Sequence, residues 1–183
     1  QSSPSRGAWQ VNNMENQVPV AVIGLGYVGM PVAWEAIRSG LTVIGFDSSE
    51  EVIDALVAGR SHVDDVADAD VAFMLSNGFE PSSSPTCLAR ASTFVICVPT
   101  PLSKELGPNL VAVQDAGRNI AANLRAGHLV ILESTSYPGT TEEVLQPILE
   151  TSGLKAGRDF SLGYSPERID PGNETVRLRS TRK

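Results

Sequence analysis

The chain has 183 residues, of which 42% are hydrophobic and 19% are charged, and this is enough apolar material for one packed domain. Its net charge of −7 argues against a general binder of nucleic acid or of anionic membranes. Two cysteines, Cys87 and Cys97, are too few for a disulfide framework, so we expect a protein of the reducing cytoplasm. The sequence holds no apolar run near the ~20 residues that a membrane-spanning helix requires.

The chain opens with a polar segment, residues 1–17, which lacks the apolar core of a signal peptide and is expected to be a flexible lead-in. The run VPVAVIG, from Val18, is β-branched and predicts a buried strand. A helix is expected over residues 27–39, with Pro31 in its first turn, where a missing N–H costs little. Residues 41–47 predict a second buried strand.

The next third of the chain has a weaker pattern. Ser48 and Glu51 have the spacing of a capping box, which opens a helix ending near Gly59. Residues 66–75 are expected to be helical. Residues 79–84 are expected to form a weak edge strand, because their proline disfavours a central position in a sheet.

Alternation resumes in the second half. Further strands are predicted over residues 92–100, 128–134 and 160–164. Asn109 is expected to cap a helix to residue 125, and Thr140 and Glu143 repeat the capping-box spacing before a helix to residue 151. The order predicts an α/β fold, a doubly wound, mostly parallel Rossmann-like sheet with helices on both faces, in a single domain.

The first strand is followed by GLGYVG, which contains Gly24, Gly26 and Gly29. In a strand–turn–helix of this kind the first glycine permits the tight turn, the second lets the backbone approach a pyrophosphate, and the third lets the helix pack closely. The start of the helix offers free N–H groups and a positive dipole end to phosphates. Tyr27 and Val28, inside the motif, are assigned to the same cofactor-binding turn.

Asp47 ends the second strand, 18 residues after Gly29, close to the spacing of an acid that binds a ribose 2′-hydroxyl. Such a carboxylate repels a 2′-phosphate, and no arginine follows it directly, so NAD is predicted in preference to NADP. The alternative is that Asp47 is only a turn or cap residue. In the doubly wound fold the strand beginning at Val20 should lie between those ending at Asp47 and Val98.

Three other loops fall at predicted strand ends: VPTP, ESTSYPGTTEE and SPERIDPGN. Taken residue by residue, the first two are ordinary turn and cap segments. The third places Glu167, Arg168 and Asp170 between two prolines, and it is either a solvated turn or the polar wall of a site.

The segments VIGLGYVGMPVA, VICVPTPL, ILESTSYPGTTEEVLQPILE and LGYSPERIDPGN together resemble the nucleotide-sugar dehydrogenases, the family of the UDP-glucose and GDP-mannose dehydrogenases. The resemblance covers residues 18–173, the NAD-binding domain of that family, and YPGTTEE and YSPERIDPGN are most similar to its UDP-N-acetylglucosamine 6-dehydrogenase branch. It implies oxidation of the C6 hydroxyl of a UDP-sugar to a carboxylate by NAD, through an aldehyde and a cysteine-bound thioester.

The resemblance also implies roles for individual residues. The glycines of the turn and Asp47 would contact NAD, and a second group would line its nicotinamide half. That second group consists of Pro99, Thr100 and Thr135, and Ser134 is also assigned to the cofactor site. Glu167 would act in acid/base catalysis, through water, and Thr135 is placed with it in the catalytic group. A metal ion is not expected.

The departures from the family limit what this chain is expected to do. The family's nucleophilic cysteine and its sugar-binding domain have no counterpart here, and Cys97, inside an apolar strand, is expected to be an inert buried thiol. We expect residues 174–183 to be an atypical basic tail, and the chain alone not to complete catalysis. The expected partner is a UDP-sugar, without nucleic acid or membrane, and homo-oligomerisation is left open.

Alternative functions remain open at this point. The chain could be a catalytically silent NAD-binding module or part of a UDP-glucose 6-dehydrogenase. A third alternative is a different Rossmann dehydrogenase, acting on a hydroxy acid or acyl substrate. It would share the glycine motif but would not explain the segments YPGTTEE and SPERIDPGN.

Overall fold

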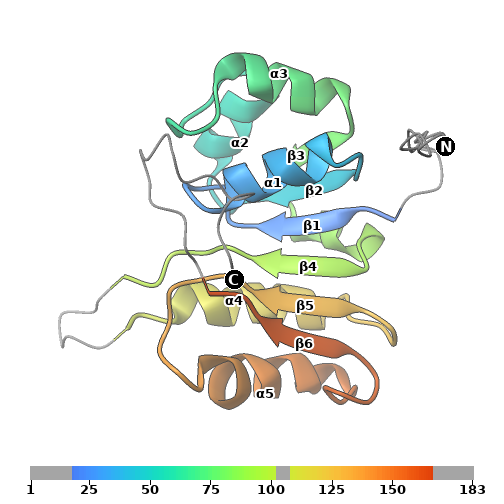
Figure 1. Cartoon of the computed structure of the whole chain (residues 1–183). Coiled ribbons are helices and arrows are strands. Elements are labelled where there is room, and N and C mark those ends of the chain that lie inside the picture. The colour runs from blue at the N-terminus through green and yellow to red at the C-terminus, as the bar shows by residue number, and fades with distance from the viewer. Residues whose placement is uncertain (1–17, 102–107, 167–183) are drawn as a thin grey trace, which may run out of the picture.

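Six parallel strands form one sheet in the computed structural model, which describes residues 18–101 and 108–166 (Figure 1). The strands are β1 (Val20–Ile23), β2 (Val43–Phe46), β3 (Phe79–Ser82), β4 (Thr93–Ile96), β5 (Leu129–Leu132) and β6 (Ser161–Tyr164). Their order across the sheet is β3-β2-β1-β4-β5-β6, so β1 lies between β2 and β4. The predicted doubly wound sheet and its switch point are confirmed, and β3 is an edge strand as expected.

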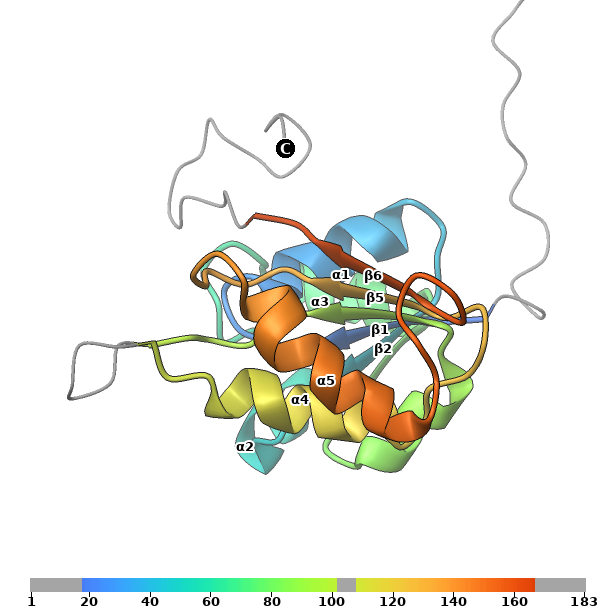
Figure 2. The same ribbon diagram turned by 90° about the horizontal axis from the view of Figure 1, so that it is seen from below.

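The side chains of the strands alternate between two cores, one on each face of the sheet. In β1, Ala21 and Ile23 belong to one buried cluster and Val22 to the other. Figure 2 shows α1 on one side of the sheet and α4 and α5 on the other. The helices are α1 (Gly29–Arg38), α2 (Glu50–Val57), α3 (Asp68–Ser76), α4 (Val111–Ala121) and α5 (Gln146–Leu149), with a 3₁₀ turn at Pro85–Arg90. The inner strands β1, β2 and β4 therefore bury side chains on both faces of the sheet, which fixes their register.

Two helix starts show how far the capping expectations hold. The expected cap Ser48 is wrong, because the hydroxyl of Ser49, one residue later, accepts from the N–H of Val52 at 3.3 Å. Asn109 lies one residue before the N-cap of α4, Leu110, which has no side-chain cap, but its Oδ1 does accept from the first N–H of the helix, that of Val111, at 3.0 Å. That helix ends at Ala121, short of the expected residue 125.

The segment after β5 departs most from the prediction. The expected capping box is wrong, because the hydroxyl of Thr140 donates to the carbonyl of Tyr137 at 2.8 Å and Gly139, at φ +97°, starts the helix. Instead of one α-helix there are a π-helical turn at Thr140–Leu145, α5 and a 3₁₀ turn at Glu150–Ser152. Pro147 explains the change, since it has no N–H to donate to the carbonyl of Glu143 four residues earlier.

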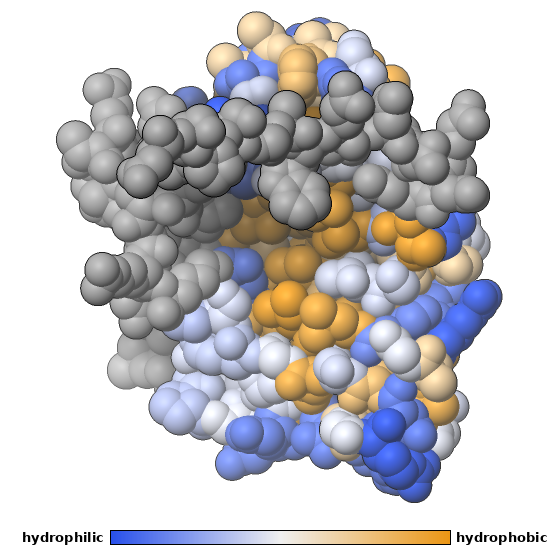
Figure 3. Space-filling view, turned by 45° about the vertical axis from the view of Figure 1, so that its right-hand side comes forward, coloured by the Kyte–Doolittle hydropathy of each residue, from blue (hydrophilic) through white to orange (hydrophobic). Residues whose placement is uncertain are grey.

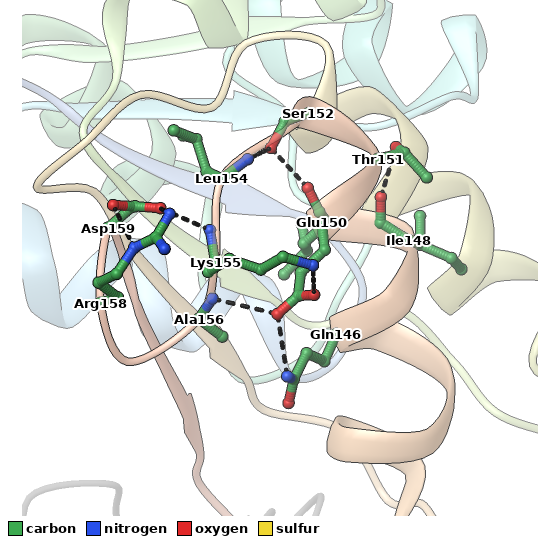
Figure 4. A network of polar contacts seen from close by, with 11 residues as sticks. Gln146, Ile148, Glu150, Thr151, Ser152, Leu154, Lys155, Ala156, Arg158 and Asp159 are labelled. Atoms are coloured by element: carbon green, nitrogen blue, oxygen red, sulfur yellow. Dashed lines mark hydrogen bonds and ion pairs between the residues drawn. The ribbon is translucent and has the colours of Figure 1, made fainter.

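A network of polar contacts holds the connection from α5 to β6 (Figure 4). The carboxylate of Glu150 accepts from the Nε2 of Gln146 at 3.0 Å, the Nζ of Lys155 at 2.7 Å and the N–H of Ala156 at 3.2 Å. Asp159 accepts from the Nη2 of Arg158 and the N–H of Lys155 through Oδ2, and from the Nε of Arg158 through Oδ1. These donors lower the pKa of both carboxyl groups, chiefly Lys155 for Glu150 and Arg158 for Asp159. The connection is thus tied down at the amino end of β6.

One face of β5 is less covered than the other. Val130 and Leu132 are buried in the core shared with α4, whereas Leu129 and Ile131, which point the opposite way, are only half-buried. Figure 3 looks obliquely at this side and shows apolar side chains gathered across its middle. Within the described residues, the helices are all too short or too polar to cross a bilayer.

Candidate functional site

The turn after β1 and the loops after β4 and β5 border a cavity of about 480 Å³. Its lining residues are Gly26, Tyr27, Val28, Cys97, Val98, Pro99, Thr100, Pro101, Glu133, Ser134 and Thr135. Parallel strands bring their carboxyl ends to the same edge of the sheet, which explains why segments distant in sequence meet here. The structure therefore brings together most of the predicted cofactor residues, from the glycine turn through to Thr135.

Each glycine of the turn meets a different spatial demand. Gly24 has φ +88°, and a Cβ there would lie 3.0 Å from the carbonyl oxygen of Cys97. A Cβ on Gly29 would lie 1.7 Å from the carbonyl oxygen of Gly24, so only glycine lets α1 start this close to the strand. A Cβ on Gly26 would meet nothing within 4 Å, which leaves the backbone there open to a ligand. These are the three roles expected of a dinucleotide-binding turn.

The electrostatics of the turn suit an anion. The ten-residue helix α1 begins at Gly29, and its first turn contains no acidic residue. The first N–H groups of a helix carry a partial positive charge and need acceptors. The amino end of α1 therefore presents donors beside the cavity, with no carboxylate in its own first turn.

Asp47 connects the end of β2 to this turn. Its Oδ2 accepts from the N–H of Leu25 at 2.8 Å, and its Oδ1 accepts from the N–H of Ser49 at 2.9 Å. The second contact is the turn role that the sequence allowed, but the first reaches across to the glycine turn. A carboxylate has about four acceptor positions, so Asp47 retains capacity for a ribose hydroxyl. The residues that follow, Ser48–Glu51, include two acids and no base, which suits NAD.

The other wall of the cavity is held by contacts between the loops after β4 and β5. The buried hydroxyl of Ser134 donates to the carbonyl of Val98 at 2.8 Å. The hydroxyl of Thr100 donates to the carbonyl of Thr135. Ser134 is thus a loop-holding residue, whereas Thr135 is exposed at the cavity.

Two residues near the turn and cavity were missed by sequence reasoning. Glu133 is only 6% exposed and lines the cavity, and a charged residue ending the apolar run HLVIL was the available signal. His62 places its Nε2 2.7 Å from the carbonyl oxygen of Leu25. Nothing in the sequence pointed to His62, because its partner lies 37 residues away along the chain.

Neither cysteine has the setting of a nucleophile. Cys97 is only 5% exposed, which confirms the expected buried position. Cys87 lies in the 3₁₀ turn before β4, away from the cavity-lining residues, and burial raises the pKa of its thiol. A raised pKa keeps the thiol protonated near neutral pH and unreactive.

Three expectations fall on parts of the chain outside the described residues: the lead-in 1–17, the acid Glu167 and the tail 174–183. Across residues 18–101 and 108–166, no group of three or more His, Cys, Asp or Glu side chains is placed to hold a metal ion.

The comparisons with known proteins agree with this geometry. Residues 18–183 match the model of the NAD binding domain of the UDP-glucose/GDP-mannose dehydrogenase family. The chain is 41% identical over 167 residues to the UDP-N-acetyl-D-glucosamine 6-dehydrogenase of Pseudomonas aeruginosa, covering 90% of this chain and 38% of that protein. It is 38% identical over 155 residues to the UDP-N-acetyl-D-mannosamine dehydrogenase of Pyrococcus horikoshii, with 84% and 37% covered.

Solved structures give the same result. The UDP-D-ManNAc dehydrogenase of Pyrococcus horikoshii superposes with a TM-score of 0.79 at 39% identity, over 84% of this chain and 37% of that one. GDP-mannose dehydrogenase from Pseudomonas aeruginosa gives a TM-score of 0.78 at 31% identity, with 83% and 36% covered. The chain thus spans well under half the length of the proteins it matches.

Proposed function

Because the chain belongs to the UDP-glucose/GDP-mannose dehydrogenase family, we propose that it supplies the NAD site of an enzyme that oxidises the C6 hydroxyl of a UDP-N-acetylhexosamine to a carboxylate. The observation that carries the proposal is the convergence of an open glycine turn, Asp47 and a cavity at the carboxyl edge of one sheet. The relatives named for UDP-N-acetylglucosamine and UDP-N-acetylmannosamine support the choice of substrate class.

The residues present fit the cofactor from one end to the other. The N–H groups around Gly26 and the start of α1 would bind the pyrophosphate, and Asp47 would accept a hydroxyl of the adenosine ribose. Pro99, Thr100 and Thr135 would border the nicotinamide half, where their loops line the cavity. NAD, when bound, supplies the hydride acceptor for oxidation at C6.

Water exclusion and orientation are the parts of the chemistry that this chain would contribute. The contacts from Thr100 to Thr135 and from Ser134 to Val98 fix two cavity loops relative to each other. A fixed wall would help to hold the cofactor in one geometry relative to the reacting carbon, and such positioning lowers the entropic part of the barrier. Glu167, which follows β6 along the sequence, is proposed as an acid/base group of the same reaction.

The thioester step needs a nucleophilic cysteine that this sequence does not supply. Its two cysteines are the buried Cys97 and the half-buried Cys87, whose pKa is raised. We therefore propose that this chain by itself binds NAD without completing the oxidation.

The test is to mix the chain with NAD and UDP-N-acetylglucosamine and to follow the absorbance of reduced cofactor. We expect binding of NAD and no sustained turnover. Sustained formation of reduced cofactor would contradict the proposal that this chain does not complete the oxidation. A titration of the chain with NAD alone measures binding, and absence of binding would contradict the whole proposal. Parallel assays with UDP-N-acetylmannosamine and with UDP-glucose test the two alternative substrates in the same way.

A further inference from the structure

Leu25, the residue between the first two glycines of the turn, has both of its main-chain polar groups held by distant side chains. Its N–H donates to the Oδ2 of Asp47 at 2.8 Å, and its carbonyl lies 2.7 Å from the Nε2 of His62. A carbonyl oxygen only accepts, so the Nε2 of His62 must carry the hydrogen in this contact. Two side chains from separate loops thus converge on one residue of the turn.

These two contacts act on consecutive peptide planes. The N–H of Leu25 belongs to the plane between Gly24 and Leu25, which Asp47 holds. The carbonyl of Leu25 belongs to the next plane, shared with the N–H of Gly26, which His62 holds. In a planar trans peptide the C=O and N–H point in opposite directions. The hydrogen bond from His62 therefore directs the N–H of Gly26 away from His62.

The loop that carries His62 is itself firmly placed. Val63 and Val66 are 4% and 1% exposed and share a buried cluster with Leu25. The hydroxyl of Ser61 donates to the carbonyl of Val63 at 2.9 Å, and the N–H of Ser61 donates to Asp68 at 2.7 Å. His62 lies between these anchors and is itself exposed, with its Nε2 at the carbonyl of Leu25. The imidazole is held at the turn by the packing of its neighbours on either side.

We propose that His62 is a positioning residue of the cofactor site, which orients the Leu25–Gly26 peptide so that the N–H of Gly26 is available to the pyrophosphate of the dinucleotide. The inference rests on the proposed NAD site and adds a residue to it that acts through Leu25. An exposed imidazole contributes little to the core, so its loss should act on ligand binding more than on folding. Both the neutral Nε2–H tautomer and the imidazolium can donate, so the contact does not depend on protonation.

The experiment compares the wild-type chain with His62→Leu and His62→Gln, titrated with NAD and with ADP in a calorimeter. His62→Leu removes the donor, while His62→Gln keeps an N–H donor on a side chain of similar reach. We expect His62→Leu to weaken NAD and ADP equally, by about 3- to 10-fold, the scale of one hydrogen bond. His62→Gln should recover most of that loss, which a merely structural role would not produce.

The chain offers a matched control in its other histidine. His128 directly precedes β5, at the amino ends of the strands and so away from the glycine turn, and its Nδ1 accepts from the N–H of Arg125 at 3.2 Å. His128→Leu should leave both affinities unchanged. Amide exchange of the free chain gives a second readout, since the N–H of Leu25, which Asp47 holds in the same turn, should exchange faster in His62→Leu than in the wild type.

The outcomes separate the two proposals. Wild-type affinity in His62→Leu together with unchanged exchange at Leu25 would overturn the positioning role, as would a His62→Gln variant no better than His62→Leu. A loss for NAD that ADP does not share would also overturn it, because the pyrophosphate is common to both. A wild-type chain that bound neither ligand would instead remove the NAD site, and with it this inference.

Discussion

The carboxylate of Asp47 accepts a hydrogen bond from the main-chain N–H of Leu25, at 2.8 Å, across two adjacent strand ends. The contact joins the acid that is expected to bind the ribose to the turn that is expected to bind the pyrophosphate. The two halves of the adenosine-diphosphate site are therefore one hydrogen-bonded unit before any ligand is present. This coupling determines what substitutions in either half should do.

Replacing Asp47 should weaken NAD and reduce the preference for NAD over NADP. In Asp47→Ala the ribose loses a charged acceptor, and we expect a loss of about 1.5–3 kcal/mol in binding free energy. Calorimetric titration of both cofactors measures the effect. Asp54→Asn, an exposed acid on α2, is the matched control and should bind like the wild type. An unchanged NAD affinity in Asp47→Ala would show that Asp47 does not bind the ribose and serves only the turn.

Gly26 and Gly29 should respond in opposite ways to the same substitution. A Cβ on Gly29 would overlap the carbonyl of Gly24, so Gly29→Ala should destabilise the fold by about 3 kcal/mol or more, the upper range of overpacking. A Cβ on Gly26 meets nothing within 4 Å, so Gly26→Ala should fold normally. It should still weaken NAD by about tenfold or more, because the methyl group occupies the approach to the backbone.

Urea unfolding and NAD titration of both alanine variants separate these effects. If Gly26→Ala bound NAD as tightly as the wild type, the open face at Gly26 would not be the path of the pyrophosphate.

The fold should lose stability on acidification in two stages. The pKa of His128 is lowered by burial and then by Arg125, so protonation is disfavoured in the folded chain. Its contribution is present above the ordinary histidine pKa and is lost as the pH falls through the lowered value. Glu150 and Asp159 also have lowered pKa values, and their contributions are lost at still lower pH, as they become protonated.

Urea midpoints across the acidic range follow both stages. Glu150→Gln should lose stability at neutral pH and show a flatter curve in the acidic stage, because its contacts to Lys155 no longer titrate. The same variant should still lose the stability contributed by His128 as the pH falls, as the wild type does. If the urea midpoints of Glu150→Gln and of the wild type changed in parallel at every pH, the Glu150 network would not contribute to the acid dependence of stability.

Glu167 should matter for turnover and not for cofactor affinity. In this chain Glu167→Gln should bind NAD as the wild type does. In a complete enzyme that contains this domain, we expect the same change to lower kcat by roughly 100-fold or more, the scale of a lost general acid or base. Normal turnover there would return the SPERIDPGN loop to a structural turn.

The sheet was predictable because its signals are local. Val20–Ile23 and Val43–Phe46 are short buried runs, and the glycine turn and the alternation with helices set the strand order. The helix between residues 140 and 152 was not predictable to the same degree. A helix does start at Thr140, but the expected capping box does not form, and Gly139 and Pro147 determine the geometry instead.

The candidate site divides in the same way. Gly24, Gly26, Gly29 and Asp47 follow from spacing along the chain, since each has a fixed place relative to a strand end. His62 depends on how the loop between α2 and α3 folds back over the turn. That return is set by the burial of Val63 and Val66, a tertiary effect with no periodic signal in the sequence.

The most direct measurement of the central claim is a calorimetric titration of the wild-type chain with NAD and, in a parallel cell, with NADP. We expect NAD to bind at one site per chain and NADP to bind at least about tenfold more weakly, because Asp47 and the acids after it repel a 2′-phosphate. Equal affinities for the two cofactors, or no heat of binding with NAD, would contradict the assignment of this edge of the sheet as an NAD site.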